Sequence, residues 1–290
     1  AANTPVYKQS LNGTWLFNWV KNPTNRPKEF MKPTINLKDW EQIKVPSNWE
    51  VEGFGTPIYV NHQYEFADYK AMIVDDMELT ERVYPKNPGK VPHTYNPVGS
   101  YRRSFTIDKT WNDKELFLHI GAMKSGGFVW INGKYVGYSQ GSKLPSEFNI
   151  TKAAKEGVNT IAIQIFRWTD GSYLECQDFW RISGIERDVY IYAQPKVRIQ
   201  DIDIVASLDK GYQNGYFELE VSLENHQKRN KEVFVNYQLF DATNQLIAEQ
   251  QNNTAVSPKK RKKTRFISNV IRPKKWSAEH PNLYTLKIST

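Results

Sequence analysis

The sequence has almost no cysteine and no long apolar run. Cys176 is the only cysteine among 290 residues, which excludes an intrachain disulfide and leaves the cellular compartment unreadable from redox chemistry. No apolar stretch approaches the roughly 18 residues that a membrane-spanning helix requires. The first five residues also lack the apolar core of a signal peptide. We therefore expect a soluble globular protein without a membrane partner, in either the periplasm or the cytoplasm.

The excess of positive charge comes mainly from one short segment. The net charge is +8, and residues 259–265 carry six of the positive charges. A basic run can mark a polyanion-binding patch, but no helix-turn-helix, zinc-finger or RNA-binding aromatic motif accompanies it. Because the run lies between two strand-like segments, we interpret it as a solvated strand or hairpin edge. We accordingly expect no nucleic-acid partner.

Helical periodicity is scarce in the first two-thirds of the chain, which reads as nearly all β. Asn132-Gly133 separates two apolar runs and is a strong hairpin signal. A single helical turn is predicted at 151–156, with Asn149 as its cap and Gly157 as its end. Many short strands with long early connections predict a jelly-roll sandwich. The strand-like runs are rich in β-branched and aromatic residues and cover 11–19, 101–107, 115–120, 127–136, 159–168 and 189–192.

Gln194-Pro195 marks a domain boundary, so we assign the jelly roll to 1–193 and a second domain to 194–290. Residues 216–221 alternate between apolar and charged, as expected for a half-buried strand. The second domain is predicted to be an immunoglobulin-like sandwich. Such sandwiches usually have seven or more strands, so this one is expected to lack its last strand. Its six strand-like runs are 197–205, 216–223, 233–240, 246–248, 264–271 and 283–288.

Two segments carry the functional signal. Residues 61–98 form a long polar loop that follows an aromatic-polar cluster, and loops of this length are usually functional or disordered. Residues 167–189 read RWTDGSYLECQDFWRISGIERDV and hold two tryptophans, two further rings, five acids and three arginines. Aromatic rings can stack on the apolar face of a sugar while carboxylates accept its hydroxyl protons. This composition favours sugar recognition.

Six separated blocks of the sequence form a recognisable series. They are SLNGTWLFNW, VPSNWEVEGFGTPIYVN, NPVGSYRRSF, WINGKYVGYSQGSKLPSEFNIT, RWTDGSYLECQDFWRISGIERDVYIY and WSAEHPNLYTLKI. These blocks resemble the bacterial β-galactosidases of glycoside hydrolase family 2, in the order found in that family. The QDFWRISGI form within the fifth block favours β-galactosidase over the β-glucuronidase and β-mannosidase relatives.

The resemblance implies a domain order of jelly roll, immunoglobulin-like sandwich and (β/α)8 barrel. The barrel of the family carries the two glutamates of a retaining mechanism. A barrel takes about 250 residues of alternating strand and helix, and no such alternation occurs here. We therefore expect an N-terminal, non-catalytic fragment of an enzyme that hydrolyses terminal β-D-galactosides. No catalytic residue is assigned, and the parent enzyme is expected to be a homo-oligomer.

The resemblance also assigns binding roles. Asp178 matches an aspartate that binds a galactosyl hydroxyl and a monovalent cation, usually Na+; the alternative is a carboxylate paired with Arg181 or Arg187. Asn61 matches an asparagine of the galactose subsite; the alternative is a turn residue. Both assignments are chemically sound, because carboxylates and amides bind hydroxyl groups and carboxylates bind hard cations.

Asp170 and Gln140 match positions that help hold a divalent cation in some relatives, so Mg2+ as well as Na+ is expected for the parent enzyme. The other ligands of those relatives come from an N-terminal extension, which we do not expect in this chain, and surface turn residues are the preferred interpretation. Glu175 and Arg181 are expected to brace the loop through ion pairs. Cys176 is read as a loop filler. Trp130, Trp168 and Tyr138 are read as core aromatics.

Two other classes of function remain open. A stand-alone carbohydrate-binding module would bind galactose or lactose without a catalytic domain. A structural or assembly module would use the 61–98 loop for oligomer contacts.

Overall fold

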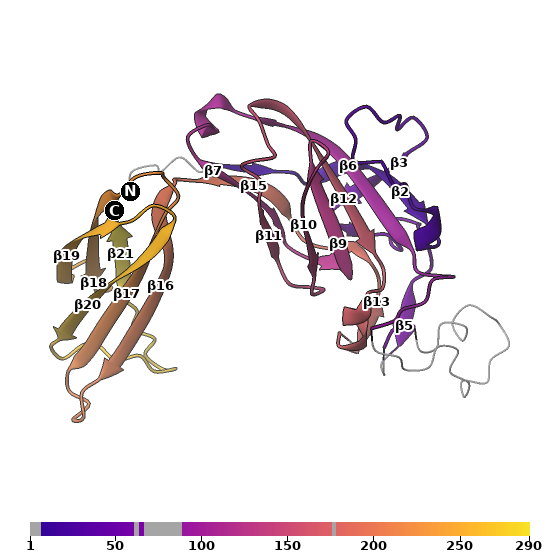
Figure 1. Cartoon of the computed structure of the whole chain (residues 1–290). Coiled ribbons are helices and arrows are strands. Elements are labelled where there is room, and N and C mark those ends of the chain that lie inside the picture. The colour runs from indigo at the N-terminus through magenta and orange to yellow at the C-terminus, as the bar shows by residue number, and fades with distance from the viewer. Residues whose placement is uncertain (1–6, 61–63, 67–88, 176–177) are drawn as a thin grey trace. The chain divides into compact units, whose positions relative to one another are not determined.

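The computed structural model describes residues 7–60, 64–66, 89–175 and 178–290, and the chain is built almost entirely from β-strands over these ranges (Figure 1). It divides into two compact units, Ala1–Gln194 (unit 1) and Pro195–Thr290 (unit 2). No helix in the described ranges is long and apolar enough to cross a membrane. The predicted all-β class, a jelly roll followed by an immunoglobulin-like sandwich, is confirmed.

Unit 1 contains two main antiparallel sheets that enclose one apolar core. The first has the order β1 (Lys8–Ser10), β15 (Val189–Gln194), β7 (Glu115–Ile120) and β11 (Ser146–Asn149). The second has the order β10 (Lys134–Gln140), β9 (Gly126–Ile131), β12 (Gly157–Phe166), β6 (Val98–Ile107), β2 (Gly13–Val20) and β3 (Glu41–Val45).

Alternating side chains explain why these segments are strands. In β7, Leu116, Leu118 and Ile120 are buried, whereas Phe117 and His119 lie on the other face, as the period of two in a strand requires. The predicted hairpin between β9 and β10 is confirmed. Asn132 and Gly133 have φ angles of 52° and 77°, and two successive positive φ values match the twist of a two-residue hairpin.

The predicted single helical turn is present, but it ends earlier than the predicted 151–156, because the chain makes one turn after Ile150 and does not continue it. The amides of Ala153 and Ala154 both donate to the Ile150 carbonyl, at 2.9 Å each. The side chain of Asn159 then accepts from the Lys155 amide at 2.9 Å and donates to the Lys155 carbonyl at 2.7 Å. Side-chain hydrogen bonds of this kind replace the bonds that would continue a helix.

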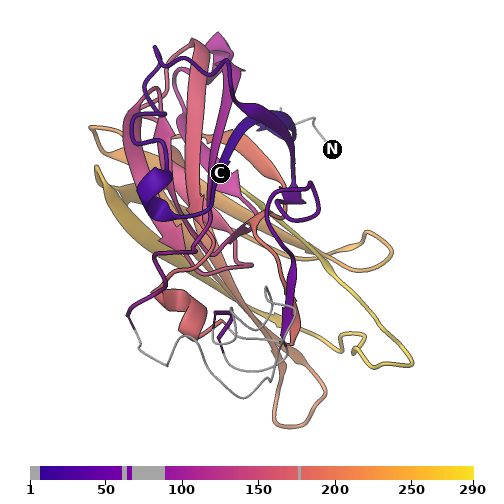
Figure 2. The same cartoon turned by 90° about the vertical axis from the view of Figure 1, so that its right-hand side faces the viewer.

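Two smaller sheets cover one end of the sandwich. One has the order β4 (Ser47–Asn48), β14 (Gly184–Ile185) and β8 (Met123–Lys124), and the other pairs β13 (Phe179–Arg181) with β5 (Ile58–Val60). β5, β13 and the 3-10 turn η3 (Asp170–Tyr173) lie at the same end of unit 1 in both views (Figure 1, Figure 2). Two further 3-10 turns are η1 (Pro23–Asn25) and η2 (Lys109–Trp111).

Unit 2, in which every residue is described, has two three-stranded antiparallel sheets around a separate core. One is β16 (Val197–Leu208), β17 (Gly215–Asn225) and β20 (Lys260–Val270); the other is β19 (Leu246–Val256), β18 (Lys231–Phe240) and β21 (Thr285–Ser289). The sequence predicted only 246–248 for the fourth strand. The observed β19 is longer than predicted. It is an edge strand whose polar residues face solvent, so much of its length lacks the apolar pattern from which a strand is predicted.

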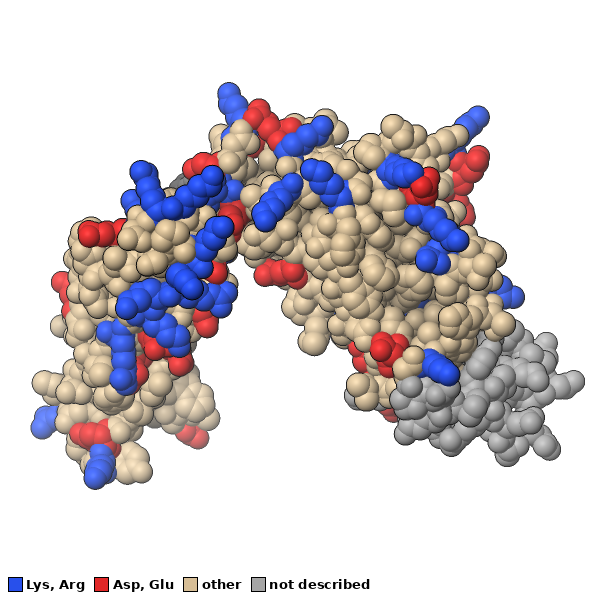
Figure 3. All heavy atoms as spheres, in the orientation of Figure 1, with Lys and Arg blue, Asp and Glu red and all other residues tan. Residues whose placement is uncertain are grey.

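The basic run at 259–265 leads into β20 and forms most of its first half. β20 is an edge strand of its sheet, so the predicted strand or hairpin edge is confirmed. Figure 3 shows Lys and Arg side chains gathered along one face of unit 2. Arg261, Lys263 and Arg265 form ion pairs with glutamates of β17.

Candidate functional site

The segment 167–189 folds into a turn and two short strands at one end of unit 1. β13 pairs with β5 so that Tyr59 lies opposite Trp180 and Ile58 lies opposite Arg181. We call this pair of strands the β5–β13 ribbon. Its inner face is closed, since Ile58 and Arg181 are 1% and 0% exposed. Its outer face is open, since Tyr59 and Trp180 are 49% and 55% exposed.

Asp178 is exposed and directly precedes β13. The Tyr59 hydroxyl donates a hydrogen bond of 2.7 Å to Oδ1 of Asp178. The ring of Tyr59 also packs against the ring of Trp180, with a centroid distance of 5.6 Å and an interplanar angle of 58°. The hydrogen bond to Asp178 and the negative charge of that carboxylate raise the pKa of Tyr59. The outer face of the ribbon therefore presents a held carboxylate beside two rings.

A buried ion pair holds the β5–β13 ribbon in place on its inner side. Arg167 and Glu50 are buried, and Nη1 of Arg167 lies 3.2 Å from Oε1 of Glu50. Arg167 also donates to the carbonyls of Thr56, at 3.1 Å, and Arg181, at 2.8 Å. Oε2 of Glu50 accepts from the Ser183 amide at 2.8 Å. Burial raises the pKa of Glu50, and the charge of Arg167 offsets part of this rise. The pair thus links the chain before β5 to β13 and to the turn after it.

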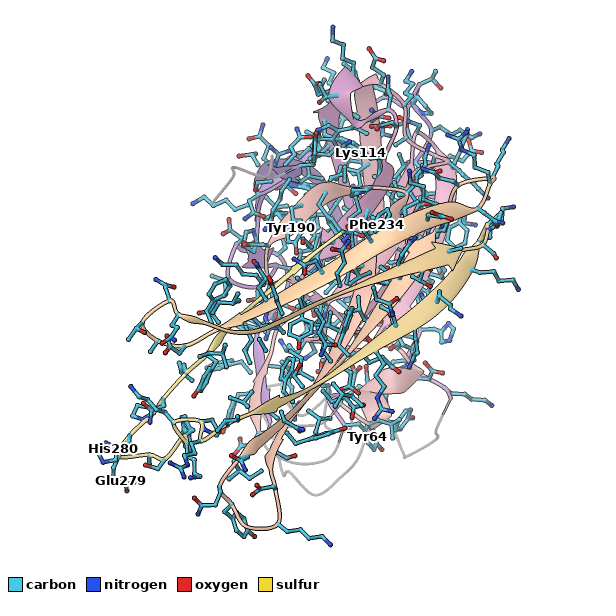
Figure 4. All side chains as sticks on the ribbon, turned by 90° about the vertical axis from the view of Figure 1, so that its left-hand side faces the viewer. Tyr64, Lys114, Tyr190, Phe234, Glu279 and His280 are labelled. Carbon is cyan, nitrogen blue, oxygen red and sulfur yellow. The ribbon has the colours of Figure 1, made fainter. Side chains whose placement is uncertain are left out.

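A second buried ion pair joins Lys124 of β8 to Glu65. Glu65 also accepts a hydrogen bond of 2.9 Å from the Trp168 indole. Burial lowers the pKa of Lys124. The surrounding rings belong to a small apolar cluster that contains Tyr64. Tyr64 lies at the opposite end of unit 1 from Lys114 (Figure 4). The cluster consists of Ile58, Tyr64, Phe66, Tyr95 and Trp168.

Asp170 and Gln140 lie side by side, as a shared site would need. Nε2 of Gln140 donates to Oδ1 of Asp170 at 2.8 Å, and the hydroxyl of Tyr138 donates to Oε1 of Gln140. Oδ1 of Asp170 also accepts from the Gly171 amide at 3.0 Å. Among the described residues, no three His, Cys, Asp or Glu side chains form a group able to hold a metal ion. A divalent-cation site at this pair stays a prediction.

Several other predicted residues can be placed. Trp168 is buried in the core, as expected, and Trp130 is half-buried. Tyr138 is 39% exposed, so reading it as a core residue was wrong; it lies on β10, where its ring packs against Phe128 at 4.7 Å. Glu175 braces the loop through hydrogen bonds, and it forms no ion pair with any described residue, contrary to the expectation. Its carboxylate accepts from the amide and hydroxyl of Ser142, at 2.8 and 2.6 Å.

Asn61 lies outside the described residues, as does Cys176. No role was predicted from the sequence for Tyr59, Glu50 or Lys124. Tyr59 and Glu50 both fall within the block VPSNWEVEGFGTPIYVN that carries the resemblance. That block offered a signal for their importance, but it contained nothing to show their partners.

Comparison with known families identifies the class of this chain. Residues 8–195 match the sugar-binding domain of glycosyl hydrolases family 2, and residues 197–290 match a second domain of glycosyl hydrolases family 2. The chain therefore belongs to glycosyl hydrolase family 2.

Curated relatives in this family are β-galactosidases. One from Priestia megaterium is 39% identical over 285 residues, which cover 98% of this chain and 26% of the relative. Another from Halalkalibacterium halodurans is 36% identical over 279 residues, which cover 96% of this chain and 25% of the relative. The chain thus spans about a quarter of the length of these relatives.

Solved structures agree on the fold. A β-glucuronidase from Bacteroides uniformis superposes with a TM-score of 0.72 at 18% identity, covering 97% of this chain and 30% of that one. A β-glucuronidase from an uncultured Clostridium species gives 0.64 at 22% identity, covering 100% of this chain and 43% of that one. At these identities, the likeness supports the fold alone.

Proposed function

We propose that this chain is the sugar-binding and immunoglobulin-like part of a β-galactosidase, in which unit 1 contributes Asp178 to the galactose subsite. The β-galactosidase relatives support the activity, and glutamates of a catalytic domain outside these 290 residues would carry out the hydrolysis of terminal β-D-galactosides. The observation that carries the assignment of Asp178 is its place on the outer face of the β5–β13 ribbon, exposed and beside two exposed rings.

The chemistry of Asp178 suits this role. Each carboxylate oxygen can accept more than one hydrogen bond, so the bond from Tyr59 leaves acceptor capacity for a sugar hydroxyl or for Na+. The rigid ribbon beneath it limits the movement that binding would otherwise have to suppress. Asn61 directly follows β5 in the sequence and remains our second candidate for the subsite. Mg2+ at Asp170 and Gln140, and a homo-oligomeric enzyme, belong to the same proposal.

The test compares the 290-residue chain with the same chain joined to a family 2 catalytic domain, using a nitrophenyl β-galactoside. We expect no turnover by the chain alone. In the joined enzyme, Asp178→Ala should raise KM, because it removes an interaction made on binding. Asp113→Ala is the matched control, since Asp113 is also exposed and pairs with Lys114, at the opposite end of unit 1 from Tyr64 (Figure 4). Turnover by the chain alone, or equal KM values for the two variants, would contradict the proposal.

A stand-alone carbohydrate-binding module is the second candidate, favoured by the exposed rings of Tyr59 and Trp180. Calorimetric titration of the 290-residue chain with galactose and lactose separates the two. A partial subsite should bind weakly because many of its polar partners are absent, whereas a complete module should bind measurably without a catalytic domain.

A further inference from the structure

We infer that Tyr59 is a positioning residue for Asp178, and that its hydroxyl fixes the carboxylate in the orientation in which it receives the sugar. This inference rests on the proposed function of Asp178. It concerns the held geometry of the carboxylate and assigns Tyr59 no contact with the sugar.

The strand register explains why these two side chains meet. Tyr59 lies directly opposite Trp180, and Asp178 precedes Trp180 by two residues. Asp178 directly precedes β13, and its hydrogen bond from Tyr59 places its carboxylate on the same side of the ribbon as Tyr59 and Trp180, in the position of a diagonal neighbour of Tyr59. Diagonal neighbours are too far apart for short side chains, but an aromatic side chain spans the gap. The observed hydrogen bond of 2.7 Å is the result of this arrangement.

Both partners of the hydrogen bond are held in place. Trp180 packs against the ring of Tyr59 at 5.6 Å and limits its rotation. Arg167 binds the carbonyl of Arg181, the last residue of β13, and that of Thr56, two residues before β5. The pKa of Tyr59 is raised, so the phenol stays protonated and keeps donating at neutral pH. The carboxylate of Asp178 is exposed, and the Tyr59 hydroxyl is its one hydrogen-bond donor among the described residues, so loss of this hydroxyl removes the contact that orients it.

Because the carboxylate of Asp178 already has a fixed orientation, less conformational entropy is lost when a sugar binds to it. We therefore expect Tyr59→Phe, which removes only the hydroxyl, to raise KM and the galactose inhibition constant about three- to tenfold, the range of one hydrogen bond. The value of kcat should change less than KM. The effect should vanish in an Asp178→Ala background, because a residue that acts through a second one has no effect once that one is gone.

The experiment uses the chain joined to the family 2 catalytic domain, with galactose as a competitive inhibitor. Tyr192→Phe is the matched control. The hydroxyl of Tyr192 also donates to a carboxylate, Oε1 of Glu147, at 3.0 Å, but in the four-stranded sheet of unit 1. Thermal melting of each variant checks that the fold is intact. We expect Tyr192→Phe to leave both constants unchanged.

The outcomes separate the two ideas. If Asp178→Ala weakens galactose binding while Tyr59→Phe behaves like Tyr192→Phe, the positioning role is wrong and the proposed function stands. If Tyr59→Phe weakens binding equally with and without Asp178, Tyr59 contacts the sugar itself and the positioning role is also wrong. If Asp178→Ala leaves galactose binding unchanged, the proposed function fails.

Discussion

Buried charged residues occupy the space under the β5–β13 ribbon. Arg167 and Glu50 form one pair there, and Lys124 and Glu65 form another. Removing charges from water is costly, and a buried pair adds little stability over an apolar pair of the same size. Such a pair does have directional hydrogen bonds, and Arg167 uses two of them to hold backbone carbonyls on either side of the ribbon. We interpret the pairs as devices that fix geometry.

Replacement of Arg167 by methionine tests this interpretation. Arg167→Met leaves Glu50 buried beside an apolar side chain, and breaking a buried pair in this way costs about 3–5 kcal/mol. Arg103→Met is the control, because Arg103 donates to the carbonyls of Leu11 and Asn12, at 2.7 and 2.9 Å, in a partly buried position. Its loss should cost about 1–3 kcal/mol. Urea unfolding of both variants measures the difference, and equal losses would show that Glu50 is not held by Arg167.

The same variant should change the pH dependence of stability. The pKa of Glu50 is already above its ordinary value of 4.5, and removing Arg167 takes away the charge that lowers it. The native state then holds a proton more tightly than the unfolded chain. Stability therefore falls as pH rises through the window between the unfolded and folded pKa values, and it stays low above that window. Urea unfolding from about pH 4.5 to 8 should show a deficit that grows with pH, and a deficit independent of pH would contradict the assignment to Glu50.

At the scale of single residues, the sequence predicts which chemical groups lie at the site better than it predicts which residues they contact. The run from Arg167 to Val189 indicated a polar and aromatic site, and the structure describes Asp178 as exposed there. The contact of Asp178 with Tyr59 joins residues 119 positions apart and depends on the register of β5 against β13. A register cannot be read from two strands of three residues each, because either strand would tolerate a shift of one position.

At the scale of single elements, β17 shows a complete alternation between core and surface. Leu219, Val221 and Leu223 are buried, and the residues between them lie on the outer face of the sheet. Glu224 lies directly opposite Arg261, and Lys263 reaches diagonally to Glu220 at 2.5 Å. Three of the six basic side chains of the run, Arg261, Lys263 and Arg265, are therefore paired with acids on the neighbouring strand.

These ion pairs should contribute little to stability. We expect the double change Glu218→Gln and Glu220→Gln to lower the free energy of unfolding by about 1 kcal/mol at low salt, since an exposed pair contributes about 0–1 kcal/mol. Glu224 is left unchanged because it also pairs with the buried Arg198. The loss should shrink in about 1 M NaCl, where the Debye length is about 3 Å. Glu232→Gln, on β18 in the other sheet, is the control. A loss that persists at this high salt concentration would show that packing, and not charge, links the two strands.

The alternation in β17 was readable from the sequence because its period of two is strict over many residues. The turn after Ile150 was readable as well, but its end was not, because a single turn and a longer helix share the same opening hydrogen bonds and differ only in the residues after them. Here the side chain of Asn159, within β12, binds the amide and the carbonyl of Lys155. The end of the turn depended on a residue beyond the predicted segment, which local propensity does not include.

At the scale of the whole molecule, the apolar residues form two large and separate cores, one in each unit. The boundary signal at Gln194-Pro195 lies where the chain passes from unit 1 to unit 2. The order of strands within each sandwich was not predicted from the sequence, because neighbours in a sheet such as β15 and β7 are distant in the chain. Pairings of that kind are set by the packing of the complete core.

Two separate cores predict two unfolding events. Leu118 and Leu219 are fully buried, one in each core, and a change from leucine to alanine in a core costs about 2–5 kcal/mol. We expect Leu118→Ala to lower the transition of unit 1 only, and Leu219→Ala that of unit 2 only. Calorimetry follows both, while tryptophan fluorescence follows unit 1, because Trp276 is the only tryptophan of unit 2. A Leu219→Ala variant whose fluorescence transition falls as far as that of Leu118→Ala would show that the two cores unfold as one.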